Sequence, residues 1–492
     1  YEAAIADYTK AIELDGTQAD YYKNRAITYH HMNDYKAAIA DYTKAIELDG
    51  THANYYYDRG IAYANNHNDK AAIADYTKAI ELDGTRAGYY NNRGTSYANN
   101  HNYEAAIADY TKAIELDKLN PMYRINRGIV EYNSKDLEAA LKDLYNETIS
   151  FANDDVMDNF RLKILMEYLE NSQNEKFNDM IGLLINENDI TLNRETGLEF
   201  VNVLYNCSNF LVLSLQKFDS RKDKPNRLFY QYTNASTLSK ICSLDVIKES
   251  QRDFSLRLYN EKYMNDPNEG KTFLEAILPE NGSKKIESIS LEEEQDVFIA
   301  SLTKEDPIKS PKTVPLWGTY GSNHNGVALG MEINELPSKK IKPQIKEDSR
   351  IVSNLYKVFY ENGGNPDVQK CIDEIKRNIG KIVRSDAIPK RTRKVILNKV
   401  SLYIRKVKFL YKKSYYSYEN EFRIIKQADL KSTFYEKNDP RLFVTLENTG
   451  LDVRLKKVVY GAKFKNPYLW EPIIKRNLGN DVEWVGTKIE YR

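Results

Sequence analysis

Residues 1–148 are built from one motif that repeats with a period of 34. The segment DYTKAIELD begins at Asp7, Asp41, Asp75 and Asp109, and Ala140 stands where a further copy would place an alanine. A period of this length is typical of solenoids, in which each unit buries its apolar face against the next unit. Apolar residues follow helical spacing twice within a unit, so we predict a hairpin of two helices per unit.

A small residue recurs at one position of each first helix, where it allows the two helices of a unit to approach closely. Together with the repeated alanines of the second helices, these residues make the region similar to the tetratricopeptide repeat family, although tyrosine stands where the family often has tryptophan. The resemblance implies an all-α solenoid whose concave face binds a peptide or another protein. The alternative is a solenoid that only holds the second domain or makes a self-assembly contact. The small residues are Ala26, Gly60, Gly94 and Gly128, and the tyrosines are Tyr22, Tyr56 and Tyr90.

First helices line the inner groove in this repeat class, and here they are rich in Tyr, Asn and Arg. Such side chains suit the recognition of a polar peptide. We therefore predict that Tyr56, Arg59, Tyr90 and Arg93 contact a partner. Packing between helices is an equal alternative for the tyrosines.

The sequence also predicts where the domains meet. We expect degenerate helices over 149–218 to cap the solenoid, a linker over 219–227, and a separate domain over 228–492. Because Tyr1 begins in the middle of a unit, we expect that further repeats precede it.

The charge balance limits the classes of partner. The chain has 71 basic and 71 acidic residues, which argues against binding nucleic acid or membranes through overall charge. Its three cysteines lack the spacing of a metal site or a disulfide framework, and no apolar run reaches the roughly 18 residues of a membrane helix. We expect no metal, no membrane contact and a cytoplasmic location.

Beyond residue 228 the pattern changes to short runs rich in Val, Ile, Phe and Tyr, separated by Pro, Gly and Asn. Such runs predict strands, and longer runs with helical spacing predict helices between them. We therefore expect an α+β domain with a helical insertion between Asp348 and Tyr411. Predicted strands cover 228–233, 296–303, 326–333, 421–426, 442–447 and 455–464, and predicted helices cover 271–278, 351–360, 368–383 and 394–411.

Four motifs follow one another in this domain. FYQYTNASTLSKI opens it, MNDPNEG begins at Met264, a third segment runs from Ser301 to Glu332, and YSYENEFRI begins at Tyr416. In this order they resemble a bacterial family catalogued as domain of unknown function 2971. That family name implies no chemistry.

The same order of parts is similar to the ADP-ribosyltransferases, which have an aromatic first strand, a second strand with Ser and a late strand with a catalytic Glu. The resemblance implies NAD as a substrate, with Glu421 catalytic and Glu419 assisting. A carboxylate would stabilise the oxocarbenium charge that develops as nicotinamide leaves. The first strand departs from the family, because it has neither the His nor the Arg usual there. The residues that would shape the NAD site are Tyr230, Gln231, Tyr232, Thr233, Ser301 and Arg423.

A strand over YYSYENEFRIIK would place Glu419, Glu421 and Arg423 on one face and Phe422 and Ile424 on the other, because side chains alternate along a strand. The charged face is then either a solvated surface with weak ion pairs or the floor of a site.

Five other residues are candidate site members, each with a structural alternative. Asp266 and Glu269 lie in MNDPNEG, which is also typical of a turn that caps a helix. Trp317 and Tyr320 lie in the third motif, where Trp317 equally suits the core. His324 is the one histidine of the second domain, and its turn-prone neighbours also suit a surface loop.

Residues 376–413 contain 14 Lys or Arg and a single acid, Asp386. A nucleic acid or a nucleotide pyrophosphate would suit this charge. Alternatively, the segment faces the acidic residues 286–296 or solvent. Three hypotheses therefore stand: a repeat scaffold coupled to a domain that transfers ADP-ribose or cleaves NAD, a non-enzymatic adaptor, and an effector that binds or cleaves nucleic acid.

Overall fold

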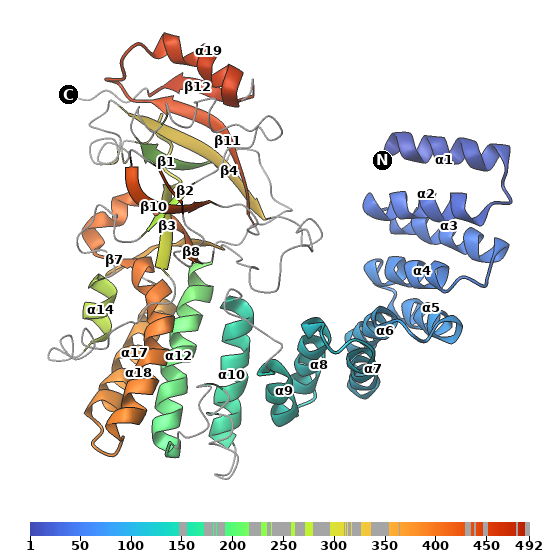
Figure 1. Ribbon diagram of the computed structural model, residues 1–492, viewed down its shortest axis with the longest axis horizontal. Helices are drawn as coiled ribbons and strands as arrows, with labels where there is room; N and C mark the ends of the chain where they lie inside the picture. The colour runs from blue at the N-terminus through green and yellow to red at the C-terminus, as the bar shows by residue number, and fades with distance from the viewer. Residues whose placement is uncertain are drawn as a thin grey trace. The chain divides into compact units, whose positions relative to one another are not determined.

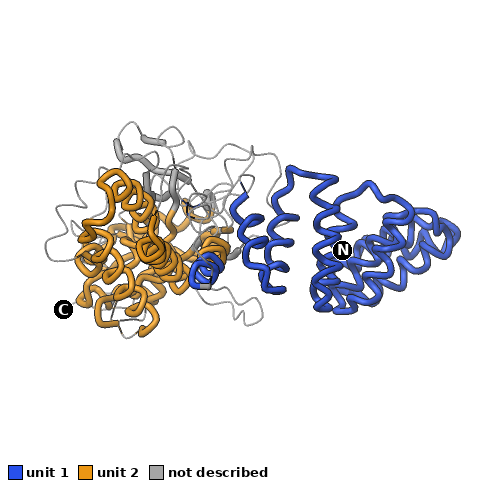
Figure 2. Tube along the Cα trace, turned by 90° about the horizontal axis from the view of Figure 1, so that it is seen from below, with its two compact units in different colours: residues 1–150, 163–184 blue, residues 151–162, 185–492 orange. Residues whose placement is uncertain are grey.

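The computed structural model divides into two compact units, of residues 1–150 and 163–184 and of residues 151–162 and 185–492 (Figure 2). It describes residues 1–146, 155–171, 181, 184, 192–215, 228–233, 238, 257–260, 271–278, 296–308, 310, 312, 316, 326–335, 354–363, 365–428, 434–436, 439–445, 451–478 and 481–487.

The first unit is a series of helix pairs in which each helix from α1 to α8 packs against the next one along the chain (Figure 1). This arrangement confirms the predicted all-α solenoid. The helices are α1 (Glu2–Leu14), α2 (Ala19–His31), α3 (Tyr35–Leu48), α4 (Ala53–Asn65), α5 (Asp69–Leu82), α6 (Ala87–Asn99), α7 (Tyr103–Leu116), α8 (Pro121–Asn133), α9 (Leu137–Leu144) and α10 (Asp155–Asn171), of which α10 has its first residues in the second unit.

The turn inside each repeat has its own sequence signal. An Asp or Asn side chain accepts a hydrogen bond from the backbone N–H three residues later and so caps the second helix. The residue before each cap has a positive φ, which ends the first helix in the left-handed conformation. The caps are Asp34, Asn68, Asn102 and Asp136, and the residues before them are Asn33, His67, His101 and Lys135.

Two glycines of the first helices lie against aromatic rings of the second helices, and Gly128 lies against Leu144. A Cβ atom on Gly60 would lie 2.6 Å from Cε1 of the buried Tyr76, and one on Gly94 would lie 3.1 Å from Cε1 of Tyr110. The close approach of the helices therefore depends on glycine most strictly at Gly60.

We expect Gly60→Ala to lower the free energy of unfolding by about 1–2 kcal/mol, because the overlap with Tyr76 outweighs the better helix propensity of alanine. Gly94→Ala should cost less, since its contact is looser. Gly380→Ala in the second unit should be stabilising by up to about 1 kcal/mol, because no atom of the described residues outside its own helical turn lies within 4 Å of its added Cβ. Urea unfolding of the three variants checks the order, and a neutral Gly60→Ala would contradict it.

The second unit is built on a sheet with the strand order β12-β11-β4-β1-β3-β2-β10-β9, in which β8 also pairs with β3, and β5 with β8. Its strand pairs are antiparallel except β11 and β12. With its helices, this sheet confirms the predicted mixture of strands and helices. The strands are β1 (Phe229–Thr233), β2 (Arg257–Asn260), β3 (Asp296–Thr303), β4 (Val327–Glu335), β5 (Asn354–Lys357), β8 (Glu421–Ala428), β9 (Phe434–Glu436), β10 (Asp439–Thr445), β11 (Leu451–Tyr460) and β12 (Glu483–Gly486), with β6 (Phe359–Tyr360) and β7 (Tyr411–Lys412) forming a separate parallel pair.

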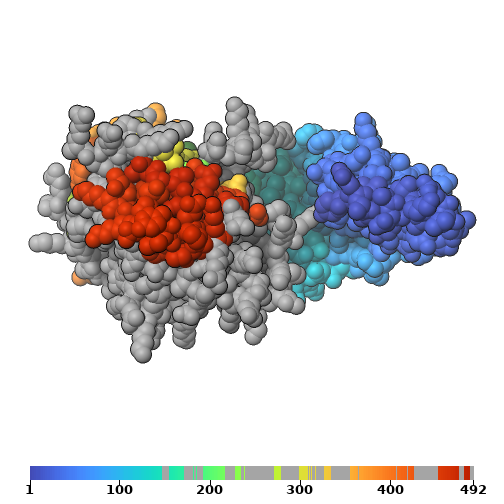
Figure 3. Space-filling model, turned by 90° about the horizontal axis from the view of Figure 1, so that it is seen from above, coloured from blue at the N-terminus to red at the C-terminus, as the bar shows by residue number. Residues whose placement is uncertain are grey.

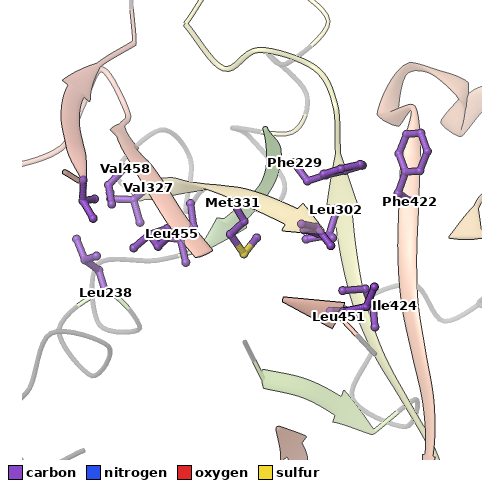
Figure 4. Close-up of a cluster of buried hydrophobic side chains, with 14 of the residues drawn as sticks. Phe229, Leu238, Leu302, Val327, Met331, Phe422, Ile424, Leu451, Leu455 and Val458 are labelled. Carbon is purple, nitrogen blue, oxygen red and sulfur yellow. The ribbon is translucent and has the colours of Figure 1, made fainter. Parts of the chain in front are cut away.

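One face of the sheet carries the apolar core. Phe229, Leu302, Met331 and Phe422, from four different strands, belong to one buried cluster (Figure 4). Because side chains alternate along a strand, the neighbours of these residues in sequence, such as Thr303, face the opposite side.

Helices pack together in the same unit. Phe210 of α12 meets Phe273 of α14 and Tyr411 of β7 in edge-to-face contacts. Tyr356 of β5 donates a hydrogen bond to Asp155 at the start of α10. The segment that contains β11, α19 and β12, red in Figure 3, lies at the surface of this unit. The helices are α12 (Arg194–Ser214), α14 (Lys271–Ile277), α17 (Pro366–Arg384), α18 (Lys390–Val407) and α19 (Pro467–Leu478).

One part of the second unit differs from the sequence prediction. The predicted helix over 351–360 is wrong: Leu355 enters the core while Tyr356 faces Asp155, an alternation that makes β5 a strand. The predicted domain boundaries stay predictions, but α12, which falls within the predicted cap 149–218, packs against α17 and α18.

Candidate functional site

An arginine in the first helix of each repeat ties three helices together. Arg59 of α4 donates from Nε and Nη2 to both carboxylate oxygens of Asp75 in α5, each at 2.7 Å. Its Nη1 donates to Oγ1 of Thr43 in the preceding α3 at 3.0 Å. Bidentate pairs of this kind are strong, and Asp75 is only 6% exposed. The equivalent sets are Arg25, Asp41 and Thr9; Arg93, Asp109 and Thr77; and Arg127, Asp143 and Thr111.

We call each of these sets of Arg, Asp and Thr an arginine clamp. The residues predicted to contact a partner belong to two of these clamps or pack against them. The guanidinium of Arg59 lies between the rings of Tyr56 and Tyr63, 5.8 Å from each ring centre, where cation–π attraction adds to the ion pair. Three of the five N–H donors of Arg59 are used within the solenoid, so Arg59 holds neighbouring helices together, and its contact with a partner stays a prediction. The same holds for Arg93, which lies between Tyr90 and Tyr97.

Other first-helix side chains form a continuous polar ladder from repeat to repeat. Asn126 of α8 donates to Asn91 of α6 at 2.9 Å, Asn91 donates to Asn92 at 3.0 Å, and Asn92 donates to the hydroxyl of Tyr57 in α4 at 2.9 Å. All four side chains are only partly buried. We call them the first-helix ladder. The composition of the first helices indicated such residues, but only the register between neighbouring helices shows which of them meet.

The carboxylates of the late motif lie in a buried network of four charges. Lys412 Nζ donates to Glu419 at 2.9 Å and to Glu421 at 3.1 Å, and Arg423 Nε donates to Glu421 at 2.7 Å. All four residues are buried, each with at most 5% of its surface exposed. The charged face of this segment is therefore neither a solvated surface nor an open floor.

Only part of the predicted strand is a strand. Glu421 and Arg423 share one face of β8, opposite Phe422 and Ile424 in the core, as predicted. Glu419 instead ends the 3-10 helix η7 (Ser414–Glu419), because Asn420 adopts a left-handed φ of 41° that separates it from β8. Lys412, which precedes η7, was not predicted as a member. Its position follows from the fold of the chain over η7, which no local pattern reveals.

The network fixes the charge of Glu421. Burial opposes its ionisation, but Arg423 and Lys412 outweigh burial, and Ser301 adds to them, so the pKa of Glu421 falls to about 2. Glu421 is thus ionised at neutral pH with both oxygens engaged. A free general base would need an unoccupied oxygen.

This shift predicts acid sensitivity of the second unit. The pKa of Glu421 is lower in the folded chain than its reference of 4.5, so its ionised form stabilises the fold above about pH 4.5, and this stabilisation is lost as the pH falls toward 2. All three tryptophans lie beyond residue 228, so tryptophan fluorescence reports on this unit alone. Urea unfolding followed in this way should show the loss, and equal stability at pH 5 and pH 3 would contradict it.

The structure brings some of the predicted NAD-site residues close to the network. Tyr230 of β1 lies opposite Thr303 of β3. In the pairing of β3 with β8, Thr303 lies opposite Glu421 and Ser301 lies opposite Arg423. Tyr230 packs with Ala328 and Val459 in a second buried cluster, and Gln231, Tyr232 and Thr233 are partly buried along the rest of β1. Asp266, Glu269, Trp317, Tyr320 and His324 lie outside the described residues.

The basic segment 376–413 divides into structural and exposed cations. Arg405 is buried and Lys399 is partly buried, Arg393 donates to the carbonyl of Ile388 at 3.2 Å, and Lys412 belongs to the buried network. The cations that are exposed and form no ion pair with a described residue are Lys376, Arg384, Lys390, Arg391 and Lys394.

Two features are absent from the part of the chain that the structure describes. No helix there is long and apolar enough to cross a membrane. No three His, Cys, Asp or Glu side chains there come together as a metal site would require.

Family models match both halves of the chain. Models of the tetratricopeptide repeat match residues 19–52, 53–86 and 87–118. A model described as a protein of unknown function (DUF2971) matches residues 316–424. The chain therefore carries tetratricopeptide repeats and a DUF2971 domain, which confirms both predicted resemblances. The DUF2971 match includes YSYENEFRI but not FYQYT or MNDPNEG.

Several solved repeat structures are similar to part of the chain. A crystal structure of MamA is 25% identical, covers 28% of this chain and 81% of its own, and has a TM-score of 0.28. The structure of YrrB, described as a TPR protein with an unusual peptide-binding site, is 26% identical, covers 36% and 91%, and has a TM-score of 0.31. The Arabidopsis OM64 TPR domain is 26% identical, covers 23% and 95%, and has a TM-score of 0.23. No curated protein matches the chain.

Proposed function

We propose that this tetratricopeptide repeat chain is a scaffold that binds a peptide segment of another protein along its first-helix ladder. The observation that supports this most is the ladder itself, which runs without interruption through α4, α6 and α8. Its four residues keep exposed surface, and their amide and hydroxyl groups are of the kind that can donate to and accept from the backbone of an extended peptide.

The arginine clamp supports the same proposal. It fixes each first helix to two second helices, so the ladder is held in place before a partner arrives. A preorganised surface loses less conformational entropy on binding.

A random 12-residue peptide display library selected against the full chain tests this proposal. For a selected peptide, Asn91→Ala/Asn126→Ala should weaken binding at least about tenfold, which corresponds to about 1.4 kcal/mol. Lys44→Ala/Lys112→Ala is the matched control, because both lysines are exposed on second helices. Peptides that bind the ladder variant as well as the wild type would contradict the proposal.

The second candidate function is cleavage of NAD or transfer of its ADP-ribose by the C-terminal domain. It is favoured by the register that places Tyr230, Thr303 and Glu421 on three adjacent strands. In this proposal the ionised Glu421 stabilises the oxocarbenium charge, while Lys412 and Arg423 hold its carboxylate in place and Glu419 positions Lys412.

Release of nicotinamide from NAD by the purified full chain tests this candidate. Glu421→Gln should abolish release under conditions where tryptophan fluorescence shows that the domain, although destabilised by the lost charge, is still folded, and the exposed Glu275→Gln should not affect release. Release that persists in Glu421→Gln, or no release by the wild type, would contradict it.

A nucleic-acid partner is a third candidate, favoured by the exposed cations around the turn between α17 and α18. Lys390, Arg391 and Lys394 lie in the first turns of α18, where positive charge is unfavourable for the helix unless an anion binds. Binding of a labelled oligonucleotide should weaken steeply with salt and be lost in the triple Glu variant of these residues. If binding of the oligonucleotide depends neither on salt nor on the three cations, this candidate is contradicted. Arg393 is unsuitable for the test, because it holds the turn together.

A further inference from the structure

We propose that Asp58 determines the specificity of the first-helix ladder by binding a lysine or arginine side chain of the partner protein. This inference rests on the proposed function, because it assigns the chemistry of the segment that the ladder binds. Asp58 lies in α4 directly after Tyr57, the residue at which the ladder ends.

Asp58 departs from the repeat. The equivalent positions of the other repeats, 34 residues before Asp58 and 34 and 68 residues after it, are all asparagine: Asn24, Asn92 and Asn126. Asn92 and Asn126 donate hydrogen bonds within the ladder. A carboxylate can only accept, so at this repeat the pattern loses a donor and gains a negative charge.

The described residues give this charge no hydrogen-bond or ion-pair partner. Although the side chain of Asp58 is partly buried, its carboxylate forms no hydrogen bond or ion pair with any residue between 1 and 146 or elsewhere in the described chain. Lys23, the cation whose charge acts on Asp58, forms its ion pair with Asp20 at 3.1 Å. Burial raises the pKa of Asp58 to about 6, and Lys23 offsets this only in part. A partly buried anion without a counter-charge is destabilising, and a bound cation would relieve it.

The surroundings of Asp58 are aromatic. Tyr57 packs against Tyr89 and Tyr76, with ring centres 4.6 and 5.8 Å apart. Burial, and after it the charge of Asp58, raise the pKa of Tyr42 and Tyr57, so these phenols stay neutral beside it. Tyrosine faces attract cations, and a carboxylate among them favours the side chain of Lys or Arg.

The parallel selection of a random 12-residue peptide library against the full wild-type chain and against Asp58→Asn tests this inference. Wild type should select peptides with Lys or Arg at one fixed position, and Asp58→Asn should not. The variant places the amide of the other three repeats at this position, so we expect it to fold. It should also melt at a higher temperature than wild type at pH 7, because the unpaired charge is removed, and this difference should shrink as the pH falls below 6.

A double-mutant cycle isolates the contact. Asp58→Asn should weaken the affinity for a selected peptide about 10- to 100-fold. Glutamine in place of the cationic residue of the peptide should weaken it to the same extent. The two changes together should cost little more affinity than either change alone. Additive losses would overturn the inference. If both chains select the same peptides and the ladder variant still weakens them, the inference fails while the proposed function stands. If neither chain selects a peptide, the proposed function fails as well.

Discussion

Arg59→Leu is expected to lower the free energy of unfolding of the repeat unit by about 2–4 kcal/mol, because a largely buried carboxylate loses its counter-charge. The side chain of Asp75 is 8% exposed, and Thr43 loses its contact to the next repeat as well. Urea unfolding of the full chain, followed by far-UV circular dichroism, measures the loss of helix. Tryptophan fluorescence reports separately on the second unit.

The control for Arg59→Leu is Lys78→Leu in the same repeat. Lys78 pairs with Glu81 on the surface of α5, where both side chains are about half exposed, so its loss should leave the unfolding curve unchanged. Arg59→Leu/Asp75→Leu should recover part of the lost stability, because no charge is then left unpaired. An Arg59→Leu chain as stable as the wild type would show that Arg59 is free to contact a partner, as its sequence position first indicated.

Arg423→Met should destabilise the second unit by about 3–5 kcal/mol, because Glu421 and Glu419 would then share the single cation Lys412 inside the protein. Arg423 has no exposed surface, and its guanidinium also donates to the carbonyl of Phe409. Urea unfolding followed by tryptophan fluorescence measures the effect in the unit concerned.

The double variant Glu421→Met/Arg423→Met tests whether the unpaired charge causes this loss of stability. It removes one positive and one negative charge together and leaves the balanced pair of Lys412 and Glu419. We therefore expect it to be more stable than Arg423→Met. If the double variant is less stable by the sum of the two single losses, the charges act independently and the network described above is not a unit.

The repeat unit could be predicted closely from sequence because its information is local and occurs several times over. The period, the caps and the helical spacing all lie within 34 residues. The role of the DYTK motif could not be read in the same way. Asp41 binds Arg25 of its own repeat while Thr43 binds Arg59 of the next, so the motif serves two neighbours whose register only the packed solenoid shows.

The candidate site of the second unit was predicted only in part. Alternation placed Glu421 and Arg423 on one face of a strand, and the structure agrees. Alternation could not predict that Asn420 ends the strand before Glu421. Nor could it predict that Lys412 donates hydrogen bonds to the carboxylates of both Glu419 and Glu421. The interpretation of the charges as solvated or catalytic left out a third outcome, a buried and fully paired network, because burial depends on elements far away in sequence.

Hydrogen exchange of the full chain with and without a selected peptide tests the central claim of a partner-binding ladder most directly. We predict that the peptide slows exchange in the first helices α4, α6 and α8, with the second helices and the DUF2971 domain unchanged. Protection confined to second helices, or to residues 316–424, would contradict the claim.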